Sequence, residues 1–133
     1  MKKLSILITI LFSLMLFSSS SYGEWEKVEI KNIENTYYID FDKIEKVDGF
    51  VYWWDMTDLL KLSPEKYSSV RGYKQGDCKL FKFKNVFFFF HKETKGEGVG
   101  DYYVSPVKWN KPSPNSISET ALKLVCNYAK WGF

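Results

Sequence analysis

The apolar positions of the chain follow two periods, and the change between them separates predicted strands from a predicted helix. Between residues 25 and 109, apolar and β-branched residues form short runs broken by turn residues, which is the pattern of β-strands. Five or six strands are expected, within residues 25–31, 36–41, 44–47, 50–56, 70–91 and 101–109. Asp48-Gly49 separates the third run from the fourth and predicts a tight hairpin turn.

The last segment of the chain is the one predicted helix. Ser116-Ile117-Ser118-Glu119 is a capping box, in which the Ser116 hydroxyl accepts the Glu119 N–H and the Glu119 side chain reaches back. The apolar residues at helical spacing are Ile117, Ala121, Leu124, Val125 and Tyr128. The sequence therefore predicts an α+β fold, with one C-terminal helix packed on one face of an antiparallel sheet of five or six strands.

Three of the predicted strands carry aromatic residues at neighbouring positions. These residues are Tyr37, Tyr38, Trp53, Trp54, Phe87, Phe88, Phe89 and Phe90. Because successive strand residues point to opposite faces, each run places aromatic rings on both faces of the sheet. One helix covers one face, so a loop, a second subunit or a ligand is expected on the other, unless sheet twist turns some rings inward. These eight residues form the predicted binding or dimer surface.

The N-terminal segment has the three parts of a secretory signal peptide. Met1-Lys2-Lys3 is cationic, residues 4–17 are apolar apart from two serines and a threonine, and Ser21 and Gly23 mark a cleavage site. The apolar core is short for a transmembrane helix, and no cysteine near the cleavage site can accept a lipid. We therefore expect a signal peptide at 1–23 and a single domain at 24–133. That domain is exported to the periplasm or cell surface without a lipid anchor or transmembrane segment.

Charge and composition narrow the function classes. The 133 residues carry a formal net charge of +3, and losing Lys2 and Lys3 with the leader leaves 17 basic against 16 acidic residues, or +1. A nearly neutral chain of this kind does not favour nucleic-acid binding. One histidine and one arginine leave few groups for acid–base catalysis or phosphate binding. Neither an enzyme nor a cofactor is expected.

Cys78 and Cys126 are the two cysteines of the chain. An exported protein meets an oxidising compartment, where two cysteines most simply form a disulfide, here stabilising by about 4 kcal/mol. A metal site would need more ligands than these two and His91 supply, and a catalytic Cys78–His91 pair would need a free thiol. The expectation is a disulfide that joins the helix to the sheet, with no metal.

Two pairs of carboxylates support an alternative, enzymatic hypothesis. Asp40 and Asp42 share a face if their strand continues, and Asp55 and Asp58 form the second pair. A small periplasmic enzyme would gather two of them in a pocket with perturbed pKa values. Turn residues and strand-edge charges are the commoner explanation of such spacings. A third hypothesis is an accessory or inhibitor subunit of another envelope protein.

Several segments, taken together, resemble the surface-adhesin protein E family of bacterial exported proteins. They are Trp25, Tyr38-Ile39-Asp40, Phe41-Asp42-Lys43-Ile44, Val51 to Met56, Asp58-Leu59, Tyr73, Asp77-Cys78, Trp109, Pro112 to Ser116, and Leu122 to Cys126. The most specific parts are the aspartate–cysteine pair and the helix that ends near the second cysteine.

The resemblance implies an antiparallel sheet joined to a C-terminal helix by a disulfide, a dimer, and binding to host matrix proteins such as vitronectin and laminin. It implies no catalytic residues. We therefore expect an exported, non-enzymatic adhesion-type protein of the bacterial envelope that acts as a homodimer through an aromatic-rich sheet face. The expected partner is a host matrix protein or another envelope protein.

Overall fold

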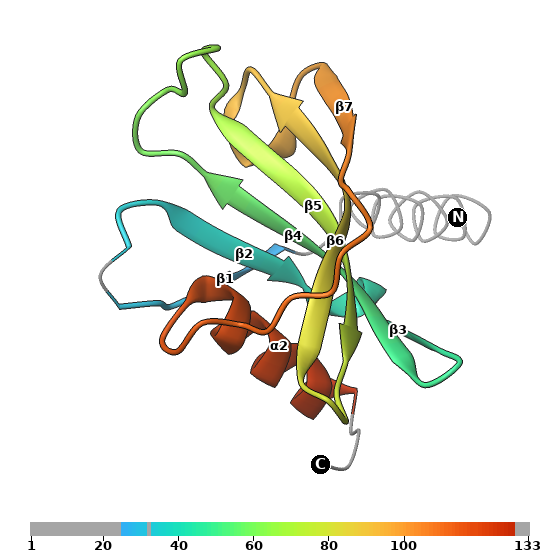
Figure 1. Ribbon diagram of the computed structural model, residues 1–133. Coiled ribbons are helices and arrows are strands. Elements are labelled where there is room, and N and C mark those ends of the chain that lie inside the picture. The colour runs from blue at the N-terminus through green and yellow to red at the C-terminus, as the bar shows by residue number, and fades with distance from the viewer. Residues whose placement is uncertain (1–24, 32, 130–133) are drawn as a thin grey trace, which may run out of the picture.

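The computed structural model describes residues 25–31 and 33–129, so the predicted signal peptide lies outside the described part of the chain. The strands are β1 (Trp25–Val28), β2 (Thr36–Asp40), β3 (Glu45–Val47), β4 (Phe50–Asp58), β5 (Ser69–Asp77), β6 (Lys82–His91) and β7 (Gly100–Val104). The helices are the 3-10 turns η2 (Phe41–Lys43) and η3 (Thr94–Gly96) and the α-helix α2 (Ile117–Tyr128). Figure 1 shows their arrangement.

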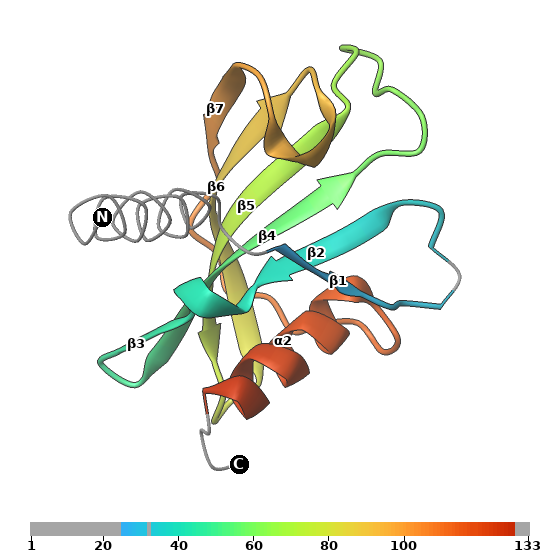
Figure 2. The same ribbon diagram turned by 180° about the vertical axis from the view of Figure 1, so that it is seen from behind.

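The seven strands form one antiparallel sheet in the order β1-β2-β4-β5-β6-β7, and β3 pairs with the first residues of β4. The helix α2 lies across one side of this sheet, at the end where β4 begins and β5 finishes (Figures 1 and 2). The predicted α+β architecture is therefore confirmed.

Two turns explain where the observed strands agree with the predicted ones and why there is one strand more than expected. Asp48 and Gly49 both have positive φ, 51° and 84°, as the predicted hairpin between β3 and β4 requires. The extended segment expected over 70–91 is instead two strands. Asp77 Oδ1 accepts the N–H groups of Lys79 and Leu80, each at 3.0 Å, and so reverses the chain. Cys78 consequently lies in a turn at the end of β5.

The Ser116 cap of the helix is confirmed, and the Glu119 side chain reaches back to Asn115, the residue before the cap, and not to the Ser116 N–H. Ser116 Oγ accepts the Glu119 N–H at 3.1 Å, and Glu119 Oε1 accepts the Asn115 N–H at 3.3 Å. These contacts satisfy N–H groups that lack partners inside the helix and fix where it starts. Ala121, Leu122, Val125 and Cys126 form its buried stripe.

The core lies between this stripe and the near end of the sheet. Val28, Tyr37, Ile39, Val51, Trp53, Phe83, the two cysteines and the helix residues form one buried cluster. Gly76 allows the close approach, because a Cβ there would stand 2.7 Å from Leu122 Cδ1 and 3.0 Å from Trp53 Cζ3. The predicted disulfide between Cys78 and Cys126 is present, with the Cα atoms 5.8 Å apart.

Within residues 25–31 and 33–129, we find no helix of the length and apolar character that crossing a membrane would require.

Candidate functional site

The strand register decides which of the eight predicted aromatic residues face the helix. Tyr37 and Trp53 are 3% and 1% exposed and belong to the core under α2. These two rings stabilise the fold and are not available to a partner, because the helix packs on their side of the sheet. Tyr38 and Trp54, their neighbours, point to the opposite side, as strand alternation requires.

Six aromatic side chains gather on the side of the sheet away from the helix, and we call them the open aromatic face. They are Tyr52, Trp54, Tyr73, Phe87, Phe89 and Tyr102, which come from β4, β5, β6 and β7. Their ring centroids lie between 5.0 and 6.3 Å apart in a continuous network. All are partly exposed, and Tyr102 is 59% exposed. Offset and edge-to-face contacts at these distances hold the rings in fixed positions.

The sequence identified three of these six residues. Tyr52 lies two positions before Trp54, so the strand period alone could have placed it on the same face. Tyr73 and Tyr102 join the face through pairing, since Tyr73 lies opposite Phe87 and Tyr102 lies opposite Phe89. Those contacts depend on the register between strands, which spacing within one strand does not give.

Cationic groups border both ends of the open aromatic face. At one end the Arg71 guanidinium carbon lies 5.5 Å from the Trp54 ring centroid and 5.0 Å from that of Phe89. At the other end Trp109 stacks on Phe50 at 5.6 Å. The ammonium nitrogens of Lys82 and Lys84 lie 5.1 and 4.9 Å from the Trp109 centroid. Aromatic rings between fixed cations can bind a partner surface that has both apolar and acidic groups.

His91 holds Arg71 in place at the end of β6. Arg71 Nε–H donates to His91 Nε2 at 2.9 Å, and His91 Nδ1 lies 3.2 Å from the Gly98 carbonyl oxygen. Burial lowers the pKa of His91, and the nearby Arg71 charge lowers it further. A neutral ring that donates from Nδ1 and accepts at Nε2 satisfies both contacts. His91 therefore has a structural role in positioning Arg71.

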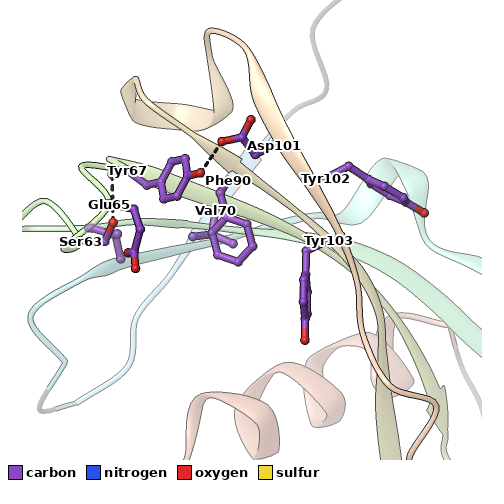
Figure 3. Close-up of a pocket in the computed structure, with 9 residues that line it drawn as sticks. Ser63, Glu65, Tyr67, Val70, Phe90, Asp101, Tyr102 and Tyr103 are labelled. Carbon is purple, nitrogen blue, oxygen red and sulfur yellow. Dashed lines mark hydrogen bonds between the residues drawn. The ribbon is translucent and has the colours of Figure 1, made fainter.

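Phe88 and Phe90 alternate with Phe87 and Phe89 along β6, so they point to the helix side of the sheet. The segment before β5 folds beside Phe90 and forms a pocket of about 440 Å³ (Figure 3). Its lining is Leu59, Ser63, Glu65, Tyr67, Val70, Phe90, Asp101, Tyr102 and Tyr103. The Tyr67 hydroxyl donates to Asp101 and the Tyr67 ring packs on Phe90 at 5.4 Å. The hydrogen bond with Asp101 raises the pKa of Tyr67. The aromatic side chains predicted from sequence thus lie in three different environments.

The carboxylates of the enzymatic hypothesis do not form a site. Asp55 is buried on the helix side, where it accepts the Tyr37 hydroxyl at 2.5 Å and the Lys74 ammonium at 2.9 Å. Burial, followed by the Asp55 charge, raises the pKa of Tyr37 well above its usual value. Asp58 is used elsewhere, since its Oδ1 accepts the Lys95 N–H at 2.6 Å. These partners give Asp55 and Asp58 structural roles.

Asp40 and Asp42 do not share a strand face, because β2 ends at Asp40 and Asp42 belongs to the turn η2. Asp40 is fully buried, with Lys43 Nζ 3.9 Å from Oδ2, and Asp42 is exposed. Among the residues that the structure describes, no three histidine, cysteine, aspartate or glutamate side chains are grouped to hold a metal ion.

The fold and the site together define a small α+β domain whose helix is joined by a disulfide to one end of a sheet that has an open aromatic face. The chain belongs to the surface-adhesin protein E family, whose sequence profile matches residues 25–127. The resemblance noted in the sequence is therefore confirmed. A sequence search among curated proteins gives no significant match.

Solved structures of Haemophilus influenzae protein E have a similar fold. One shares 23% sequence identity at a TM-score of 0.60, covering 80% of this chain and 89% of that one. A second crystal form shares 20% identity at a TM-score of 0.59, covering 83% and 96%. Protein E from a non-typeable strain shares 23% identity at a TM-score of 0.58, with 78% of each chain covered. At these identities the likeness establishes the fold.

Proposed function

We propose that the chain is an exported, non-enzymatic adhesion-type protein of the bacterial envelope. In this proposal it acts as a dimer, and the open aromatic face is its contact surface. Membership of the surface-adhesin protein E family supports the class. The leader-like segment at 1–23 supports export. The partner is a host matrix protein or another envelope protein.

The observation that carries the proposal is the six-ring network on the side of the sheet that α2 does not cover. The core that stabilises the fold lies on the helix side of the sheet. Clustered aromatic rings at a surface are typical of contact sites. Arg71 supports the same interpretation. Tryptophan, tyrosine and arginine are the residues most enriched at the centres of interfaces.

A direct binding test uses protein purified from the periplasm after expression of the full 133-residue chain. Immobilised vitronectin, immobilised laminin and a bacterial envelope extract are each presented to the wild type and to a Trp54→Ala/Tyr73→Ala variant. We expect the wild type to bind at least one of the three and the variant to lose about tenfold or more in affinity. The control is Tyr128→Ala, which removes an exposed ring from the helix.

Two outcomes would contradict the proposal. Wild-type protein that binds none of the three would remove the adhesion function. Equal binding by the wild type and the open-face variant, both folded by circular dichroism, would show that the contact surface lies elsewhere. Sedimentation equilibrium at micromolar concentration tests the dimer separately, and a monomer there would remove that part of the proposal.

A further inference from the structure

The pocket between the segment before β5 and the strands β6 and β7 has no part in the proposed function, and we call it the Tyr67 pocket. Its volume of about 440 Å³ lies in the range of small-molecule sites. Three aromatic rings line it, and the Phe90 centroid lies 5.4 Å from that of Tyr67 and 6.4 Å from that of Tyr103. Phe90 and Tyr103 point to the helix side of the sheet, whereas the Tyr102 ring points to the other side of β7 (Figure 3). The Tyr67 pocket is therefore separate from the open aromatic face.

Hydrogen bonds hold the pocket wall that precedes β5. The Leu59 N–H donates to the Ser68 carbonyl at 2.9 Å and closes this segment into a loop. The Ser68 N–H donates to the His91 carbonyl at 2.8 Å, which attaches the loop to β6. The Tyr67 hydroxyl donates to Asp101 and attaches the loop to β7. A wall fixed at both strands forms a cavity without help from a ligand.

Two carboxylates line the Tyr67 pocket. They belong to Glu65 and Asp101, and neither forms an ion pair with a basic side chain among the described residues. Tyr67 donates to Asp101 Oδ2, so Oδ1 can accept from a further donor. The pKa of Tyr67 is raised most by the hydrogen bond with Asp101, and the Glu65 charge raises it further. Both carboxylates thus act on the same phenol.

Lys92 places an ammonium group beside the pocket. Its Nζ lies 4.2 Å from the Tyr67 ring centroid and donates to the Glu65 backbone carbonyl at 2.7 Å. The Tyr67 ring therefore already attracts one cation. Because Lys92 uses the backbone of Glu65, the carboxylate of Glu65 stays unpaired. One ammonium against two carboxylates leaves this part of the surface with a net negative charge.

Rings and carboxylates in one cavity discriminate between classes of ligand. An anion would meet two like charges. An uncharged apolar molecule would displace water from the carboxylates without replacing its hydrogen bonds. An organic cation suits both parts of the lining, because aromatic faces and carboxylates each attract an ammonium group. Its apolar body would cover Leu59 and Val70, which also line the cavity.

We propose that the Tyr67 pocket binds a small organic cation, an ammonium group carried on an apolar or aromatic body. The ammonium group lies beside Asp101 and Glu65, and the body packs on Phe90 and Val70. This activity is additional to the proposed adhesion function and uses the other side of the sheet. One molecule can therefore hold the cation and a macromolecular partner at the same time.

Titration calorimetry with three probes that share a benzyl group tests the preference for positive charge. Benzyltrimethylammonium, benzyl alcohol and phenylacetate are titrated into the full chain purified from the periplasm. We expect benzyltrimethylammonium to bind with a dissociation constant of about 1 mM or below, and the neutral and anionic probes to bind about tenfold more weakly or less. Phenylacetate that binds as tightly as the ammonium compound would overturn the inference. So would the absence of benzyltrimethylammonium binding at about 10 mM.

Substitutions that remove charge or a ring test the location. Glu65→Gln/Asp101→Asn keeps the side-chain shapes and an acceptor for the Tyr67 hydroxyl, and should weaken benzyltrimethylammonium binding about tenfold or more. Tyr103→Leu keeps an apolar side chain at an exposed position and should weaken it about threefold. The matched control is Asp42→Asn, which removes an exposed carboxylate of η2 and should leave the affinity unchanged. Wild-type affinity in a folded Glu65→Gln/Asp101→Asn variant would overturn the inference.

The open-face variant Trp54→Ala/Tyr73→Ala separates this inference from the proposed function. It should bind benzyltrimethylammonium as the wild type does, although it loses affinity for the macromolecular partner. Loss of ammonium binding in this variant, with full binding by Glu65→Gln/Asp101→Asn, would place the cation on the open aromatic face and contradict the inference. A wild type that binds the ammonium probe but no matrix or envelope protein would remove the adhesion function and support the Tyr67 pocket.

Discussion

The two faces of the sheet use the same residue types for different purposes. On the helix side Trp53 is 1% exposed and packs in the core with Val51 and Leu122. On the other side Trp54, the next residue, remains partly exposed and contacts Tyr73 and Phe87. Burial of the Trp53 ring under the helix stabilises the folded state. The Trp54 ring buries less of its surface on folding, so the surface that stays exposed can contact another molecule.

Aromatic content alone does not locate an interaction surface in this sheet. Tyr37 lies in the core beside Asp55, and Phe90 lines the pocket shown in Figure 3. The open aromatic face differs because α2 packs on the opposite side of the sheet and the six rings remain partly exposed. Substitutions on the helix side should therefore lower stability, and those on the open face should mainly change binding.

The largest difference is expected between the two neighbouring tryptophans. Trp53→Ala should lower the free energy of unfolding by about 3–5 kcal/mol, because it leaves a cavity under the helix. Trp54→Ala should cost about 1–2 kcal/mol, since its ring is only partly buried. Urea unfolding followed by circular dichroism measures both. Equal losses would mean that the open face contributes to the core as much as the covered face does. If Trp53→Ala does not fold, the pair Trp53→Phe and Trp54→Phe gives the same comparison on a smaller scale.

The next largest effect on the free energy of unfolding is expected from removing the disulfide, which joins the helix to the sheet. Replacing Cys78 and Cys126 together by alanine should lower the free energy of unfolding by about 2–5 kcal/mol, because the unfolded chain regains the freedom of a 48-residue loop. A thiol assay on denatured, unreduced wild type should find no free thiol. Two titratable thiols would contradict this assignment.

A smaller effect is expected where the sheet meets the helix most closely. Gly76→Ala would place a Cβ 2.7 Å from Leu122 Cδ1, so the helix must shift at a cost of about 1–3 kcal/mol. In a Leu122→Ala background the same glycine substitution should cost less, because the opposing methyl group is gone. Thermal unfolding of the four proteins gives the coupling. Identical costs in both backgrounds would show that Leu122 is not the obstacle.

The smallest effect is a pH dependence at the Arg71 end of the open aromatic face. The folded-state pKa of His91 is lowered from 6.5 by burial, so the unfolded chain binds the proton more readily. Its contribution to stability is therefore complete above pH 6.5 and is lost as the pH falls from there through the folded-state pKa. Unfolding measured from pH 8 to pH 5 should show this loss in the wild type. His91→Asn keeps a donor toward Gly98 and should reduce the slope, and an unchanged slope would assign the pH dependence to other groups.

Much of the fold could be predicted because it depends on local signals. Asp48-Gly49 supplies the positive φ values of a two-residue turn, and Ser116 with Glu119 fixes the helix start. The division of Trp53 from Trp54 follows from strand alternation. Alternation does not say which of the two faces the helix, however, because that depends on where α2 packs.

The remaining features depend on contacts between distant segments. The turn after Asp77 was missed because the apolar pattern continues through residues 78–83, and the reversal comes from two hydrogen bonds to one carboxylate. Tyr73 and Tyr102 join the open aromatic face through register with β6. The pocket beside Phe90 exists because the segment around Tyr67 folds back onto β7. None of these is encoded in the spacing of residues within one strand.

Hydroxyl-radical footprinting of the protein, free and bound to whichever of vitronectin, laminin or envelope extract it binds, tests whether the open aromatic face is the contact surface. Oxidation rates of Trp54, Tyr73 and Tyr102 are compared between the free and bound protein, with Tyr128 on the helix as the reference. The three open-face residues should lose reactivity on binding, and the reactivity of Tyr128 should not change. Protection of Tyr128 with unchanged oxidation of Trp54 and Tyr73 would contradict it, because the partner would then lie on the helix side of the sheet.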